Sequence, residues 1–366
     1  MKGILEYIEQ YSDVAFDKKP FGNVDGLILS QFAYLKFDSI VPKVGEKGTD
    51  ILLKDLQLCD AYEDLFADER YAKNNRELYE LMANSLRFGS IRLNHYINLV
   101  SRKWELQFSA ITCTLSDGET IVVYRGTDES VVGWKEDFNM AYMTPIPSQI
   151  KAVDYLNYVS ERIAGDFIVC GHSKGGNLAV YAAMKCPESI GKRITSIYSY
   201  DGPGFTRKAL SEGEYSLVRD RIRKFVPKSS IVGMLLQSQE HYNTVESKKI
   251  GILQHDPFNW VVDEDDFVYV KDIDNIAAIH KKTIDEWTDN IGDDEMRDFI
   301  NQLYEVIDSV GINDLNDFRG NYADILIRFT RALDSIDDKH KELVKTIFKS
   351  LIDSFIETVK HQAGIS

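Results

Sequence analysis

The chain has 366 residues, a formal net charge of −15 and a hydrophobic content of 44%. The acidic balance, with no long basic stripe to offset it, argues against a nucleic-acid partner. No apolar stretch reaches the roughly 18 residues of a membrane span, and the first residues become acidic too early for a secretory signal. We therefore expect a cytoplasmic protein that is large enough for one α/β core and a smaller addition.

The four cysteines show neither close pairing nor the spacing of metal ligands. Free thiols in a reducing compartment are therefore the expected state. The sequence predicts no metal and no cofactor, and it gives no indication of the oligomeric state.

Residues 1 to about 100 carry apolar side chains at helical spacing and are predicted to be mostly helical. Two apolar runs at 106–115 and 120–124, joined by Ser-Asp-Gly-Glu, predict a hairpin. The later elements expected are a helix at 152–162, a strand from 167 with a helix after it, a strand at 194–200, a helix at 208–221 and a strand from 224. This alternation predicts a mostly parallel sheet flanked by helices.

Beyond about residue 275 the pattern is helical only. Apolar residues recur at every fourth position from Leu343 to Val359, which is the stripe of an amphipathic helix. We expect this helix to pack against the core or an adjoining helix, and a dimer contact or a cap over a site is the alternative. The chain is thus predicted to divide into a domain at 1–274 and a helical extension at 275–366.

The most informative stretch is Gly171-His172-Ser173-Lys174-Gly175, which follows an apolar strand and precedes a helix-forming run. It fits the Gly-x-Ser-x-Gly nucleophile elbow, in which a strained turn holds a serine at the edge of a sheet and glycines let neighbouring backbone pass closely. A glycine-rich turn whose serine caps the helix is the alternative. We interpret Ser173 as a catalytic nucleophile.

A second strand ends in Arg125-Gly126-Thr127. In a hydrolase of this layout that strand end lies beside the nucleophile. The backbone N–H groups of Thr127 and Lys174, helped by the Thr127 hydroxyl, are then candidates for an oxyanion hole. An ordinary strand end with a capping threonine is the alternative. The Lys174 ammonium is expected either near the mouth of the site or in solvent.

Together with Trp134, Asp137 and the motif at 171–176, the Arg-Gly-Thr sequence resembles the core of the class 3, fungal-type lipases. The wider pattern, which includes 4–7, 24–27, 230–233 and 254–256, is similar to a family of uncharacterised, lipase-like intracellular bacterial proteins. The resemblance extends to about residue 270. It implies an α/β-hydrolase fold, here with a helical N-terminal segment and a helical C-terminal addition, and a hydrolytic reaction whose substrate it does not name.

In the α/β-hydrolase fold the triad follows the chain order serine, acid, histidine. Five of the seven histidines follow Ser173, and His255 is the best placed, in a loop after the strand-like sequence 249–253. The others, in a polar turn or in charged helical sequence, are His241, His280, His340 and His361. An imidazole suits a general base because its pKa of about 6.5 lets it accept and return a proton near neutral pH.

The position of the triad acid differs from that in the class 3 lipases. Those lipases usually carry an aspartate where this chain has Ser229 and Ser230. Asp201, which ends the preceding strand, is the nearest substitute on the same edge of the sheet, and a hydrogen bond to the glycine turn after it is its alternative role. Asp256 is the rival, although the immediate neighbour of His255 rarely has the reach to orient its ring.

The segment 131–148 is rich in apolar residues and is a candidate lid or wall of an acyl site, although these side chains could instead pack onto the core and leave a shallow, acetyl-sized site. We predict a serine hydrolase that cleaves a small-molecule ester or thioester with an apolar acyl group. In this prediction His255 deprotonates Ser173 and Asp201 orients the imidazole. The alternative is a hydrolase-fold protein without catalysis that binds a ligand or partner.

Overall fold

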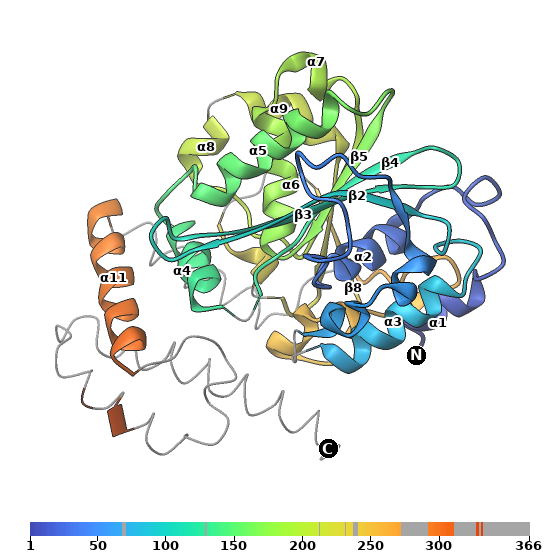
Figure 1. Cartoon of the computed structure of the whole chain (residues 1–366). Helices are drawn as coiled ribbons and strands as arrows, with labels where there is room; N and C mark the ends of the chain where they lie inside the picture. Colours follow the sequence, from blue (N-terminus) through green and yellow to red (C-terminus); the bar gives the residue numbers. More distant parts are fainter. Residues whose placement is uncertain are drawn as a thin grey trace.

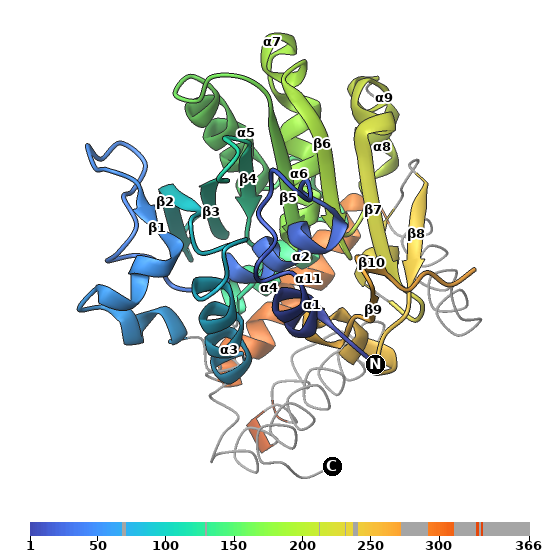
Figure 2. The ribbon, with the colours of Figure 1, turned by 90° about the vertical axis from the view of Figure 1, so that its right-hand side faces the viewer.

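The computed structural model describes residues 1–67, 71–128, 130–211, 213–230, 232–236, 241–271, 292–310, 327–328 and 331. Its centre is an eight-stranded sheet in which the strands lie in chain order, as Figure 2 shows. The strands are β1 (Ile51–Leu52), β2 (Arg92–Ser101), β3 (Leu106–Thr114), β4 (Thr120–Tyr124), β5 (Phe167–His172), β6 (Ile194–Tyr200), β7 (Ile222–Pro227) and β8 (Tyr242–Val245). Strands β4 to β8 run parallel, whereas β1, β2 and β3 pair antiparallel.

Helices cover both faces of the sheet (Figure 1). One face carries α1 (Ile4–Gln10), α2 (Asn23–Phe32) and α3 (Ala72–Ala83). The other carries α5 (Pro147–Ser160), α6 (Lys174–Lys185) and α9 (Glu214–Val218). The mostly parallel sheet with helices on both sides confirms the predicted fold class, which is that of the α/β hydrolases.

The two buried layers follow from the alternation of side chains along each strand. In β4, Ile121 and Val123 join the core beneath the N-terminal helices, whereas Val122 and Tyr124 join the core beneath α5 and α6. Successive residues of a strand point to opposite faces, so a strand covered on both sides is apolar throughout. The β3–β4 pairing confirms the predicted hairpin.

A buried ion pair helps to hold the N-terminal helices together. Arg87, in the segment after α3, donates from Nη2 to Oδ2 of Asp25 at 2.6 Å and from Nε to Oδ1 at 2.8 Å. Both side chains are fully buried, and Tyr7 also donates to Asp25. The pair thus ties α1 and α2 to the segment that leads into the sheet.

Three expectations about the secondary structure are wrong. The helix predicted at 208–221 is instead divided into α8 (Arg207–Ser211), α9 and η3 (Arg219–Arg221), with Gly213 at a φ of 84° before α9. The first hundred residues are not mostly helical: α1, α2 and α3 cover only part of this segment, and Arg92–Ser101 forms the ten-residue strand β2. The strand-like sequence before His255 is not a strand either: the backbone turns at Gly251, where φ is 60°, into the 3-10 helix η5 (Gly251–His255). Apolar runs of this length fit strand and helix alike, so their periodicity does not separate the two.

The remaining short elements are η1 (Leu53–Leu58), η2 (Tyr62–Phe66), α4 (Val131–Asn139), α7 (Glu188–Gly191), α8 (Arg207–Ser211), η3 (Arg219–Arg221), η4 (Val232–Met234), η6 (Pro257–Asn259), β9 (Val262–Asp263) and β10 (Asp266–Phe267). Strands β9 and β10 form a separate antiparallel pair. In the predicted C-terminal extension, α11 (Asp293–Val310) packs against α4, and Figure 1 shows the two side by side. The amphipathic stripe from Leu343 to Val359 lies outside the described residues.

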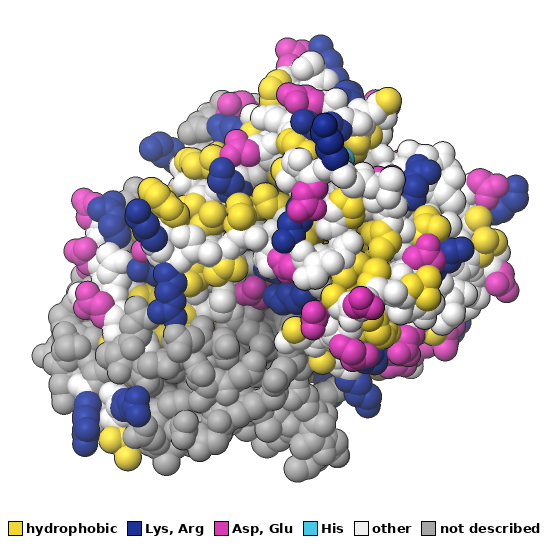
Figure 3. Space-filling view, viewed as in Figure 1, with side chains coloured by type: hydrophobic (Ala, Val, Ile, Leu, Met, Phe, Trp, Pro, Cys, Tyr) yellow, Lys and Arg dark blue, Asp and Glu magenta, His cyan; other side chains and the backbone are white. Residues whose placement is uncertain are grey.

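Charged side chains of both signs are interspersed with hydrophobic ones on the face shown in Figure 3. All four cysteines are free thiols, with Cys113 and Cys170 buried and Cys59 and Cys186 half-buried. Among the described helices, none combines the length and apolar character that crossing a membrane requires.

Candidate active site

Ser173 lies at the tight turn between the central strand β5 and the helix α6. Its backbone has φ 59° and ψ −134°, a conformation that a residue with a side chain rarely adopts. The turn brings Gly175 against β4, where a β-carbon would come within 2.1 Å of the Tyr124 carbonyl oxygen. The stretch therefore has the geometry of a nucleophile elbow rather than that of a simple helix cap.

The end of β4 passes directly beside the serine. A β-carbon at Gly126 would lie 3.0 Å from that of Ser173 and 2.6 Å from the carbonyl oxygen of His172. The next residue, Thr127, is 8% exposed. Lys174 opens α6, where the first N–H groups have no acceptor within the helix. The two backbone amides expected to form an oxyanion hole thus belong to segments that meet at Ser173.

The described structure also brings Asp201 and His255 together. Nδ1 of His255 lies 2.7 Å from Oδ2 of Asp201. A carboxylate accepts, so Nδ1 carries the proton and Nε2 is left as the basic nitrogen. Asp201 is fully buried directly after β6, with φ at 50°, whereas the His255 side chain is 22% exposed.

Ser230 accounts for the departure from the class 3 pattern. Its hydroxyl donates to Oδ1 of Asp201 at 2.5 Å, and the backbone N–H of Gly233 donates to the same oxygen at 3.1 Å. A β-carbon at Gly233 would lie only 2.2 Å from that oxygen, so a side chain there would collide with the carboxylate. The loop after β7, where an aspartate was expected, instead supplies two hydrogen bonds to the aspartate of the neighbouring strand.

The other candidates have different surroundings. Asp256 accepts a hydrogen bond from the backbone N–H of Phe258 at 3.0 Å and so caps η6. His241 is exposed. The histidines that lie outside the described residues are His280, His340 and His361.

His172, the residue before the nucleophile, was not expected to contribute to the site. Its ring lies against that of His255, with 4.5 Å between ring centroids. Its Nε2 donates to the His255 carbonyl oxygen at 2.8 Å, which leaves Nδ1 to accept from the Tyr34 hydroxyl at 3.2 Å. His172 therefore ties the loop that carries His255 to β5 beside the elbow. Its position inside the Gly-x-Ser-x-Gly motif was the sequence feature from which this role could have been predicted.

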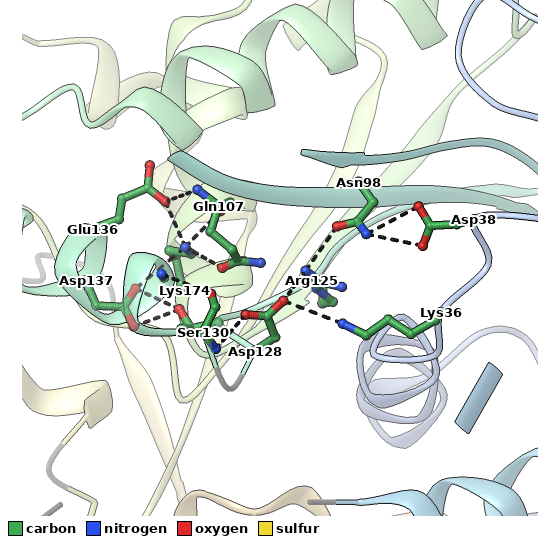
Figure 4. Close-up of polar contacts among 12 residues, drawn as sticks. Lys36, Asp38, Asn98, Gln107, Arg125, Asp128, Ser130, Glu136, Asp137 and Lys174 are labelled. Atoms are coloured by element: carbon green, nitrogen blue, oxygen red, sulfur yellow. Dashed lines mark hydrogen bonds and ion pairs between the residues drawn. The ribbon is translucent and has the colours of Figure 1, made fainter. Parts of the chain in front are cut away.

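The Lys174 side chain corrects both sequence interpretations of its ammonium, because it is 1% exposed and reaches neither the mouth of the site nor solvent. Its Nζ donates to Oε2 of Glu136 at 2.9 Å and to two acceptors of Gln107, the carbonyl oxygen at 2.9 Å and Oε1 at 2.8 Å. Glu136 belongs to α4 and is fully buried. Figure 4 shows this ammonium enclosed between α4 and β3.

The hydroxyl of Thr127 points to the next residue of α4. Its Oγ1 donates to the Asp137 carboxylate, with 2.7 and 2.8 Å to the two oxygens. Burial and the neighbouring Glu136 raise the pKa of Asp137 to about 6, against the lowering effects of Lys174, the Thr127 hydrogen bond and the nearby His255. The Asp137 side chain retains 37% exposure, so water also reaches it.

The rest of the network in Figure 4 fixes the chain between β4 and α4. Arg125 donates from Nη2 to Oδ2 of Asp128 at 3.0 Å, and Lys36 pairs with the same oxygen at 3.5 Å. Burial raises the pKa of Asp128, but Arg125 and Lys36 outweigh it and hold the pKa well below its usual range. The hydroxyl of Ser130 then accepts from the Gly133 N–H at 3.2 Å and caps α4.

The predicted lid segment is built mainly of α4, which α11 contacts. The ring centroids of Phe138 and Tyr304 lie 6.3 Å apart, and the Arg297 guanidinium lies 5.8 Å from the centre of the Tyr142 ring. Trp134, Tyr142 and Met143 remain half-buried. Some side chains of this segment thus pack against α11, whereas others remain partly exposed.

A pocket of about 430 Å³ lies at the opposite edge of the sheet, near the β3–β4 turn. Its lining includes His95, Thr114, Gly118 and Arg162 but none of the candidate catalytic residues, so we assign the site from the elbow and the Asp201–His255 contact. Among the residues that the structure describes, no cluster of His, Cys, Asp or Glu is arranged to hold a metal.

Comparison with known proteins finds one matching family model and several similar solved structures. The family model described as Mbeg1-like matches residues 82–305. The chain is similar to the M37 lipase at 16% identity over 57% of this chain and 68% of that one, with a TM-score of 0.36. It is similar to the Rhizomucor miehei lipase in its propeptide complex at 14% identity over 46% and 68%, with a TM-score of 0.33. It is similar to a fungal lipase in complex with an inhibitor at 13% identity over 55% of this chain and 83% of that one, with a TM-score of 0.36. No curated protein matches significantly.

Proposed function

The chain belongs to the Mbeg1-like family, and we propose that it is a serine hydrolase that cleaves a carboxylic ester or thioester through an acyl-serine intermediate. The observation that carries the proposal is the 2.7 Å contact between His255 and a buried Asp201, together with the strained elbow conformation of Ser173. A buried carboxylate that orients an imidazole, in a chain that also holds a serine in a nucleophile elbow, matches the parts of a Ser-His-Asp triad.

In the proposed reaction Nε2 of His255 takes the proton of the Ser173 hydroxyl as Oγ attacks the carbonyl carbon. The resulting oxyanion is stabilised by the backbone N–H groups of Lys174 and Thr127. Collapse of this intermediate breaks the bond to the alcohol or thiol, which leaves with the proton that His255 returns. Water, activated by the same imidazole, then hydrolyses the acyl-serine and restores the hydroxyl.

Asp201 is suited to the role of the triad acid because its other oxygen already accepts hydrogen bonds from Ser230 and Gly233. These contacts keep the carboxylate in place while it orients Nδ1 of His255. The apolar acyl group and the cytoplasmic location stay predictions. A partner-binding protein that has lost catalysis is the alternative, since a fold does not determine an activity.

Hydrolysis of an activated short-chain aryl ester tests the proposal. The wild-type protein is expected to release the phenol catalytically, and Ser173→Ala is expected to lose several powers of ten in rate because the nucleophile and the base act as a unit. Equal rates for the two folded proteins would favour the binding alternative.

A further inference from the structure

Two consecutive residues of α4 bind the two residues whose amides form the proposed oxyanion hole. Glu136 holds the ammonium of Lys174, with 2.9 Å between Oε2 and Nζ. Asp137 accepts the hydroxyl of Thr127 at 2.7 Å. The two segments that meet at Ser173 are the end of β4 and the start of α6. Through these side-chain contacts, both are attached to the same turn of α4.

The Lys174–Glu136 pair is fully satisfied by hydrogen bonds. The ammonium has three acceptors, one on Glu136 and two on Gln107. The carboxylate also accepts from the backbone N–H of Gln107 at 3.0 Å and from that of Ser148 at 2.7 Å. Buried charges are tolerated where such geometry compensates for lost hydration. The pair thus joins β3, α4 and the start of α5 to the first residue of α6.

From this geometry we infer that Lys174 is a positioning residue whose ammonium, through Glu136, aligns the oxyanion hole. The inference rests on the proposed function. Oxyanion donors act only when they lie about 2.7–3.1 Å from the developing charge. A displacement of about 1 Å in such a site can reduce the rate about 100-fold. The Lys174 side chain links the first turn of α6, and with it the Lys174 N–H, to β3 and α4.

The test compares Lys174→Met with Lys185→Met. Methionine keeps an unbranched stem at position 174 and removes the ammonium. Lys185 lies at the other end of α6 and pairs with Glu214 at 2.6 Å, so it is a matched control on the same helix. With an aryl ester, and with rates divided by the sites titrated with a fluorophosphonate, we expect Lys174→Met to lower kcat about 10- to 100-fold with little change in KM. Lys185→Met should keep the wild-type value.

A second readout is the affinity for an aryl boronic acid, which forms a negatively charged tetrahedral adduct with the serine. This affinity should fall in step with kcat/KM in Lys174→Met, because both depend on the oxyanion donors. Glu136→Gln, which removes the charge partner at nearly constant size, should cause the same kind of loss. Its effect should be non-additive with that of Lys174→Met. If Lys174→Met does not fold, Glu136→Gln carries the test alone.

An unchanged kcat per titrated site in either folded variant would overturn the positioning role while leaving the hydrolase proposal intact. A loss of titratable sites with normal kcat per remaining site would also overturn it, because that result indicates structural support only. A wild-type protein that neither hydrolyses the ester nor reacts with the probe would instead overturn the proposed function, and the positioning role with it.

Discussion

The Ser230 hydroxyl donates a 2.5 Å hydrogen bond to the Asp201 carboxylate, so two adjacent strand ends cooperate to hold one acid. Asp201 follows β6, and Ser230 follows β7. Class 3 lipases usually carry the triad aspartate where this chain has Ser229 and Ser230. In this chain, Ser230 instead donates a hydrogen bond to the aspartate on the neighbouring strand, Asp201. The same carboxylate contacts His255 through its other oxygen.

Replacement of Asp201 by asparagine is expected to reduce turnover by about 10³- to 10⁴-fold, because an amide no longer holds the imidazole in the tautomer with a basic Nε2. Asp256→Asn is the matched control, since Asp256 caps η6. Steady-state kinetics on an aryl ester measure both. A smaller loss for Asp201→Asn than for Asp256→Asn would move the role of the acid to Asp256.

Ser230→Ala is expected to lower kcat about tenfold, since a hydrogen bond to a charged group is worth about 1.5 kcal/mol or more. Ser229→Ala is the control, because Ser229 bonds to Oε1 of Gln254 through its backbone N–H, which alanine retains. Equal kcat values for the two variants would show that the Ser230 hydroxyl does not contribute to catalysis.

The raised pKa of Asp137 predicts a pH-dependent stability. Its pKa of about 6 in the folded protein lies above the ordinary value of 3.8, so the protonated carboxyl favours folding. This contribution is complete below pH 3.8 and is lost as the pH rises through about 6. Asp137→Asn cannot titrate, so its melting temperature should rise relative to that of the wild type between pH 4 and pH 8.

The effect should be small, because the 37% exposure of the Asp137 side chain lets solvent screen the charge. Thermal unfolding at pH 4, 6 and 8 checks it. Asp154→Asn, on the exposed side of α5, is the control. A melting-temperature difference between Asp137→Asn and wild type that does not depend on pH would contradict the assignment.

The half-buried side chains of the lid segment predict a preference for longer acyl groups. Each buried methylene is worth about 0.8 kcal/mol, or nearly fourfold in affinity. Trp134 and Met143 are half-buried on this segment and are the candidate contacts. Measured across esters with acyl groups of two to about ten carbons, kcat/KM should rise through the medium lengths. A steep fall after acetyl or propionyl would indicate a shallow site instead.

The sheet and the elbow were predictable because both leave local signals. The alternation of strands and helices gave the mostly parallel sheet, and the Gly-x-Ser-x-Gly motif placed Ser173 between β5 and α6. The choice of Asp201 followed from the rule that parallel strands end at the same edge of a sheet. The contact of Asp201 with His255 joins residues 54 positions apart, and only their places in the fold bring them together.

The surroundings of Lys174 were not predictable in the same way. A lysine in the first turn of a helix is normally solvated, and its acceptors Gln107 and Glu136 lie on other elements far away in the sequence. The ring contact of His172 with His255 likewise depends on a loop that returns from beyond β8. Burial and partners of polar side chains are tertiary properties, so a local pattern does not encode them.

The most direct test of the central claim is the site of covalent labelling by a fluorophosphonate, mapped by peptide mass spectrometry. The account predicts one phosphonylated residue, Ser173, with labelling abolished by Ser173→Ala and strongly slowed by replacement of His255 with alanine. A folded wild-type protein that remains unlabelled, or that labels at another serine, would contradict the account.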